Sequence, residues 1–237
     1  MGLFDDQIEE VRRLAGEWSS EGKARALGGV TEPWPRGPGL VLEEDTAFEL
    51  GNPAVASLSL LMWSDGGGVE DGRVTVVGPD VPELRERSVP FAQVLVVGGS
   101  FTDEYESYRD IRDAVYDTHL VGFSVRTMPS RQTIWCRVSR DAVARGFSLG
   151  HLGAALLASL KGVEGVERAE AVFVTSSAAD VKRLAGAAAG AQRIVDAMMK
   201  MYGERNFDCS TCEYKDVCES VDALKVMRKK LLGEKAG

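Results

Sequence analysis

The sequence predicts an α/β (α+β) protein: a mixed β-sheet with helices packed on it, then a helical C-terminal segment with a cysteine metal loop. Strand-like and helix-like patterns alternate between residues 40 and 177, and helical patterns dominate from residue 178 onward. Such alternation is typical of a sheet covered by helices. The expected units are an N-terminal helix with a Pro/Gly-rich connector (1–39), an α/β domain (40–177) and the helical segment with its cysteine loop (178–237).

The first segment, GLFDDQIEEVRRLAGEW, has apolar residues at helical spacing, including Phe4, Ile8, Val11 and Trp18. This period predicts an amphipathic helix. The following TEPWPRGPG contains three prolines and two glycines, which interrupt regular structure. Because an indole is costly to leave in water, Trp34 indicates that this connector is ordered.

Five segments of the middle region are predicted strands because they are apolar or alternate with period two. They are AVASLSLLMW, RVTVVG, FAQVLVVGG, RQTIWCRVS and AEAVFVTS. Two helices are predicted between the later strands. DEYESYRDIRDAVYDTHLV carries a stripe with Tyr105, Tyr108, Ile111 or Arg112, Val115 and His119, and SLGHLGAALLASLKGV begins at Ser148, a plausible N-cap.

The C-terminal segment contains two further helical patterns, separated by the cysteines. AADVKRLAGAAAGAQRIVDAMMKMYG is rich in alanine, and VDALKVMRKKLLGEKAG ends with basic residues.

Composition narrows the classes of function. The chain has 237 residues, a formal net charge of −8, 44% hydrophobic residues and 27% charged residues. The acidic balance argues against nucleic acid as a partner. No apolar run is long enough to cross a membrane, and the acidic start MGLFDDQIEE does not resemble a signal peptide. We therefore expect a cytoplasmic protein without a membrane partner.

The cysteines give the strongest indication of a functional site in this sequence. Three of the four, Cys209, Cys212 and Cys218, form a C-x2-C-x5-C pattern, and Cys136 stands alone upstream. In a reducing compartment, clustered thiols are more often metal ligands than disulfides. A [4Fe–4S] cluster is the favoured occupant and zinc the alternative. Since four ligands are usual, either Cys136 or an outside group completes the set; the alternative for Cys136 is a small buried apolar residue.

A second candidate site surrounds the strand RQTIWCRVS. Period two places Ile134, Cys136 and Val138 on one face and Trp135 and Arg137 on the other. Further arginines flank the strand, among them Arg126 and Arg131. Guanidinium groups bind phosphates and an indole can stack on a purine, so this face suits a nucleotide-containing cofactor such as coenzyme A. The alternative is a solvated face on which carboxylates neutralise the arginines.

The phrases RVTVVGPDVPEL, RQTIWCRVSRDAVARGFSLGHLGAALLASL and AEAVFVT resemble the acetyl-CoA synthase subunit, the β subunit of the carbon monoxide dehydrogenase/acetyl-CoA synthase complex. The resemblance covers roughly residues 40 to 185. It implies an arginine-rich α+β domain involved in coenzyme A binding. In that family a catalytic domain follows, in which cysteines hold a [4Fe–4S] cluster bridged to a two-nickel site and a Cys-Gly-Cys motif holds the distal nickel.

This sequence departs from the family at the catalytic centre. It contains no Cys-Gly-Cys motif, and Cys212 and Cys218 are closer together than the resemblance implies. We therefore expect no nickel site and no complete acetyl-CoA synthesis by this chain alone. The expected role is a reduced or accessory form in one-carbon and corrinoid metabolism, with a corrinoid protein or a CO dehydrogenase-like partner. The alternative is a non-catalytic binding module stapled by a structural iron–sulfur cluster or zinc.

Overall fold

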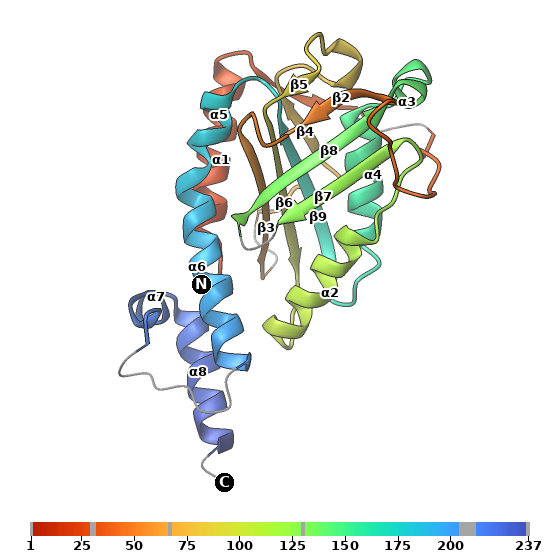
Figure 1. Cartoon of the computed structure of the whole chain (residues 1–237). Coiled ribbons are helices and arrows are strands. Elements are labelled where there is room, and N and C mark those ends of the chain that lie inside the picture. The colour runs from red at the N-terminus through yellow and green to blue at the C-terminus, as the bar shows by residue number, and fades with distance from the viewer. Residues whose placement is uncertain (1, 29–31, 66–67, 129–130, 204–211, 236–237) are drawn as a thin grey trace.

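The computed structural model describes residues 2–28, 32–65, 68–128, 131–203 and 212–235, with side chains up to residue 232. Two sheets and several helices make up this part of the chain (Figure 1). A five-stranded sheet has the order β1-β4-β9-β6-β3, and a four-stranded sheet has the order β5-β2-β8-β7. The α+β class and the mixed strand directions expected from the sequence are confirmed, although one sheet was expected and two are present.

The five-stranded sheet forms the centre of the molecule. Its strands β3 and β6 run parallel, as do β4 and β9, whereas β6 and β9 are antiparallel and β1 pairs antiparallel with β4. The bounds are β1 Ala24–Leu27, β3 Ser57–Ser64, β4 Val74–Val77, β6 Phe91–Gly99 and β9 Val166–Val174. All nine residues of β6 are buried, which explains its nearly continuous apolar sequence.

The four-stranded sheet is built around β8, Thr133–Ser139, which pairs antiparallel with β7, Phe123–Met128, and with β2, Thr46–Leu50. The short β5, Ser88–Val89, adds a parallel edge. As predicted, Ile134, Cys136 and Val138 share the buried face of β8. The sequence did not reveal β1, β2, β5 and β7, because these strands are short and three of them lie at sheet edges, where β1 and β7 are largely exposed.

Helices cover both faces of the five-stranded sheet. On one face lies α1, Asp5–Ser20, which buries Ile8, Val11, Leu14 and Trp18. On the other lies α4, Leu149–Leu160, where Gly153 lets the helix approach Val74 and Phe173. The side chain of Ser148 caps α4 by accepting a hydrogen bond from the His151 amide, as the sequence predicts. The connector is also ordered, since Trp34 is 9% exposed and its indole donates to the Val121 carbonyl.

The remaining helices frame the sites described below. They are α2, Glu104–Tyr116; α3, Arg140–Ala144; α5, Ala178–Arg183; α6, Ala185–Gly203; α7, Lys215–Ser220; and α8, Asp222–Lys235, together with a short 3-10 helix at Val81–Glu83. The long α6 runs beside α1 and extends past the sheets to α7 and α8 (Figure 1).

Candidate functional site

Two of the three clustered cysteines lie against the same small cavity. Cys212 and Cys218 line a space of about 20 Å³ between α6, α7 and α8. Cys218 is buried in α7, and Cys212 is partly exposed just before it. Cys209 lies outside the described residues, and within them no group of three or more His, Cys, Asp or Glu side chains is placed to hold a metal. The structure therefore brings Cys212 and Cys218 together, while the cysteine metal loop stays a prediction.

The surroundings of these two cysteines are cationic and apolar. Ala197, Met201 and Tyr214 line the cavity together with Lys200, Lys215 and Arg228. The Lys200 ammonium lies 5.8 Å from the Tyr214 ring centroid and 3.4 Å from a Glu213 carboxylate oxygen. On the outer side, one Arg193 nitrogen donates to both carboxylate oxygens of Asp216, at 2.6 and 2.7 Å, which fixes α7 to α6.

Cys136 has a different environment. It lies at the centre of β8, opposite Leu50 on β2 and Val125 on β7, and is fully buried. Burial raises the pKa of the Cys136 thiol above its usual range, which favours the neutral form. Figure 1 shows β8 in the four-stranded sheet and α7 beside α6, away from that sheet. The role of Cys136 as a fourth ligand stays a prediction, and its packing fits a small apolar residue of the core.

The Trp135 face has the arrangement predicted from the strand period. Trp135 and Arg137 project to the same side of β8, and Arg126 lies opposite Trp135 on β7. The guanidinium carbons of Arg137 and Arg126 lie 4.9 and 5.6 Å from the Trp135 ring centroid. The indole Nε1 of Trp135 is buried without a hydrogen-bond partner among the described residues. An orphaned donor beside two cations is a feature expected of a binding site for an anionic ligand.

The arginines of this face are not equivalent. Arg137 donates to Glu49 at 3.1 Å, and both side chains are largely buried, so this charge is neutralised internally. Arg126 is exposed and makes no ion pair with a described residue, and it lines a cavity of about 90 Å³ with Trp135 and Arg137. Arg131 is exposed and lies outside that cavity. The structure thus brings together three of the four predicted cofactor-binding residues.

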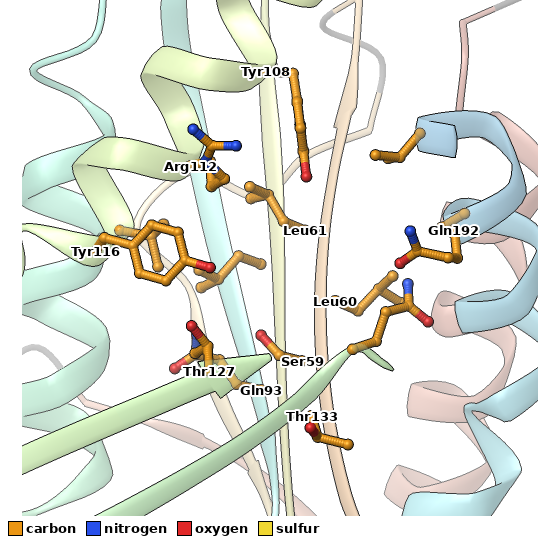
Figure 2. Close-up of a pocket in the computed structure, with 15 residues that line it drawn as sticks. Ser59, Leu60, Leu61, Gln93, Tyr108, Arg112, Tyr116, Thr127, Thr133 and Gln192 are labelled. Carbon is orange, nitrogen blue, oxygen red and sulfur yellow. The ribbon is translucent and has the colours of Figure 1, made fainter. Parts of the chain in front are cut away.

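A further cleft, which sequence reasoning missed, lies between α2, α6 and the ends of both sheets (Figure 2). It has a volume of about 80 Å³ and opens to solvent. Fifteen residues line it: Ser59, Leu60, Leu61, Gln93, Leu95, Tyr108, Arg112, Val115, Tyr116, Thr127, Gln132, Thr133, Ala191, Gln192 and Val195. The only sequence signal was Arg112 on the same helical stripe as Tyr108 and Val115, because a charged residue on a packed face often serves a polar cavity.

Comparison with known proteins places this chain in a family. A family model described as the CO dehydrogenase/acetyl-CoA synthase complex beta subunit matches residues 39–179. These residues include both sheets from β2 onward and the Trp135 face, but not the cysteine cavity.

The chain is also similar to curated beta subunits of acetyl-CoA decarbonylase/synthase complexes. An acetyl-CoA decarbonylase/synthase complex subunit beta 2 of Methanosarcina thermophila is 29% identical over 62% of this chain and 31% of its own length. The subunit beta of Methanothermobacter thermautotrophicus is 39% identical over 46% of this chain and 23% of its own length. The subunit beta of Methanopyrus kandleri is 33% identical over 47% of this chain and 24% of its own length.

The chain spans less than a third of the length of these relatives. In the part of the chain that the structure describes, no helix combines the length and apolar character needed to span a bilayer. Because the family model matches more than half of the 237 residues, this chain belongs to the CO dehydrogenase/acetyl-CoA synthase complex beta subunit family.

Proposed function

We propose that this chain is an iron–sulfur protein that serves as an accessory form of the family's β subunit. The observation that carries the proposal is the placement of Cys212 and Cys218 on one cavity beside Lys200, Lys215 and Arg228. Cys209, three residues before Cys212, is the third ligand. The fourth ligand is a group from outside the chain or Cys136. A [4Fe–4S] cluster bound there would supply one-electron transfer.

The residues present fit such a group. Thiolates are the ligands that iron–sulfur clusters prefer. A cluster ligated by several thiolates carries net negative charge, and three cationic side chains line the cavity with the two cysteines. Their charge complements the cluster and is a means by which a protein sets its reduction potential. Packing of α7 and α8 against α6 holds these groups in place.

The proposed setting is one-carbon and corrinoid metabolism in the cytoplasm. The relatives are named as subunits of an acetyl-CoA decarbonylase/synthase complex, which supports a CO dehydrogenase-like partner, with a corrinoid protein as a second. The sequence has no Cys-Gly-Cys motif, so the proposed role excludes a nickel site in this chain. The competing function is a binding module in which the metal, iron–sulfur or zinc, only ties α7 to α6.

Metal and sulfide analysis tests the proposal. Protein prepared without oxygen is expected to contain about four iron and four acid-labile sulfide per chain, and its reduced form is expected to give an EPR signal. Stoichiometric zinc without sulfide would reject the iron–sulfur assignment. A cluster that cannot be reduced reversibly would favour the binding module, because a structural staple needs no accessible second redox state.

A specific observation also favours coenzyme A at the Trp135 face. The indole N–H of Trp135 has no hydrogen-bond partner among the described residues, and the Arg126 guanidinium makes no ion pair with any of them. Both residues line one cavity. We propose that an adenine lies against the indole and that phosphate groups bind the arginines. Arg126 contributes more than Arg137, because Glu49 already accepts a hydrogen bond from Arg137.

Calorimetric titration of coenzyme A is expected to give saturable binding that Arg126→Ala weakens by about tenfold, since a charge-assisted contact contributes roughly 1.5–3 kcal/mol and about 1.4 kcal/mol corresponds to a tenfold change. Arg137→Ala should weaken binding less. Arg109→Ala, an exposed arginine on α2 outside this cavity, serves as the control. Negligible heat for all four proteins would leave the solvated-face interpretation.

A further inference from the structure

The cleft in Figure 2 is built from residues that are far apart in the sequence. Ser59 and Leu61 come from β3, Gln93 from β6, Tyr108 and Arg112 from α2, and Gln192 from α6. In Figure 2 the hydroxyls of Tyr108, Tyr116 and Ser59 and the amide of Gln192 point toward the same space. With Thr127 of β7 and Thr133 of β8, six elements contribute polar residues to one cavity. The proposed cluster and the Trp135 face use none of these residues.

The polar groups of the cleft can all donate hydrogen bonds. Its serine, threonine, tyrosine and glutamine side chains all carry N–H or O–H groups, and Arg112 adds a guanidinium. Although the chain has 36 acidic residues, no Asp or Glu is among the described residues that line the cleft. The hydroxyls and amides can also accept hydrogen bonds, so the preference for an anionic ligand comes from Arg112, the charged residue among those that line the cleft.

Gln93 also contributes to the cleft. It is 4% exposed and lines the cleft as well as the neighbouring cavity toward His119. Its amide is not among the buried groups of the described residues that lack a partner, so it borders the open space of the cleft. There it can form hydrogen bonds with a ligand or with water.

The other side chains that line the cleft indicate which further groups a ligand should have. Apolar side chains of Leu61, Leu95, Val115 and Val195 alternate with the polar groups, so the ligand has a short hydrocarbon part. Arg112 lies at the side of α2, where its Nε and Nη2 donate to Asp113 at 3.1 and 2.9 Å and its guanidinium carbon is 5.7 Å from the Tyr108 ring centroid. Asp113 forms an ion pair with Arg112 and offsets part of its charge. The Nη1 group of Arg112 makes no hydrogen bond to Asp113 and is available to a carboxylate beside Tyr108.

We propose that this cleft binds a small aliphatic carboxylate. The carboxylate accepts hydrogen bonds from Arg112 and the tyrosine hydroxyls, and the hydrocarbon part lies against the leucine and valine walls. This site is separate from the proposed cluster and from the Trp135 face, so its test does not depend on either.

Calorimetric titration of butyrate into the full chain tests the proposal, with butyramide as the neutral ligand of the same shape. Butyrate is expected to bind saturably and at least tenfold more tightly than butyramide. Arg112→Gln should weaken butyrate binding at least tenfold and bring the two ligands to similar affinities. The matched control is Arg109→Gln, which removes an arginine of the same helix that does not line the cleft and should change nothing.

A second variant keeps the test decisive if Arg112→Gln does not fold. Tyr116→Phe removes one hydroxyl from a side chain that is 37% exposed, so folding should be preserved while butyrate affinity falls severalfold. Equal affinity for butyramide and butyrate, or no saturable heat with butyrate, would overturn the proposal. So would inorganic phosphate that competes as well as butyrate, because the site would then recognise charge without the hydrocarbon part.

Discussion

Replacing Cys212 by serine is expected to remove most of the iron and acid-labile sulfide from protein prepared without oxygen. A serine hydroxyl is a poor substitute for a thiolate, and only three cysteines are available near α7. Cys218→Ser should have the same effect, with some additional loss of stability because Cys218 is 5% exposed. Iron and sulfide assays, together with the visible absorption of the cluster, measure the result.

Two further variants make this result specific. Ser220→Ala changes an exposed residue of the same helix α7 and should leave the metal content unchanged. Cys136→Ser decides the fourth ligand. If an outside group completes the set, this variant keeps its iron but loses about 1–3 kcal/mol of stability, because a hydroxyl replaces a fully buried thiol in β8. Full iron in Cys212→Ser would contradict the proposed cluster site.

Asp180→Ala is expected to lower the free energy of unfolding by about 3–5 kcal/mol. Asp180, in the first turn of α5, is 4% exposed and accepts hydrogen bonds from the Trp18 indole at 3.0 Å and from two serine hydroxyls, Ser176 and Ser177, at 2.7 and 2.8 Å. The Lys23 ammonium is 3.6 Å away. These contacts tie the end of α1 to α5, and the alanine variant leaves buried donors without an acceptor.

Urea unfolding measures this loss. Asp141→Ala is the control, because Asp141 is an exposed carboxylate paired with Arg145 on the surface and should cost less than about 0.5 kcal/mol. A loss below 1 kcal/mol for Asp180→Ala would contradict the structural role given to this network.

The same network predicts a pH dependence. Burial by itself would raise the pKa of Asp180, but the hydrogen bonds to its carboxylate outweigh burial and hold the pKa below its usual range. The carboxylate therefore contributes full stability above the unfolded-state pKa of about 3.9, and this contribution is lost as the pH falls through the folded-state pKa. The stability difference between wild type and Asp180→Asn should be the same at pH 7 and pH 5 and should shrink below about pH 4.

The sequence by itself determined the elements whose residues carry a strong period. The stripe of Ile8, Val11, Leu14 and Trp18 predicted α1, and the apolar, β-branched segment FAQVLVVGG predicted β6 as a strand. Period two also placed Trp135 and Arg137 on one face of β8, and the short spacing of Cys212 and Cys218 brought them onto one cavity. In each case the residues belong to one element or lie within a few residues of it, so local geometry is sufficient.

The tertiary structure alone decided the features that join distant segments. The strands β1, β2, β5 and β7 depend on hydrogen bonds from partners, because their own sequences are short or polar, and with them came the second sheet. The place of Cys136 in that sheet, apart from α7, also follows from pairing with Leu50 and Val125. The sequence could not predict the cleft for the same reason. Its residues Ser59, Gln93, Arg112 and Gln192 lie on four elements, and only packing brings them together.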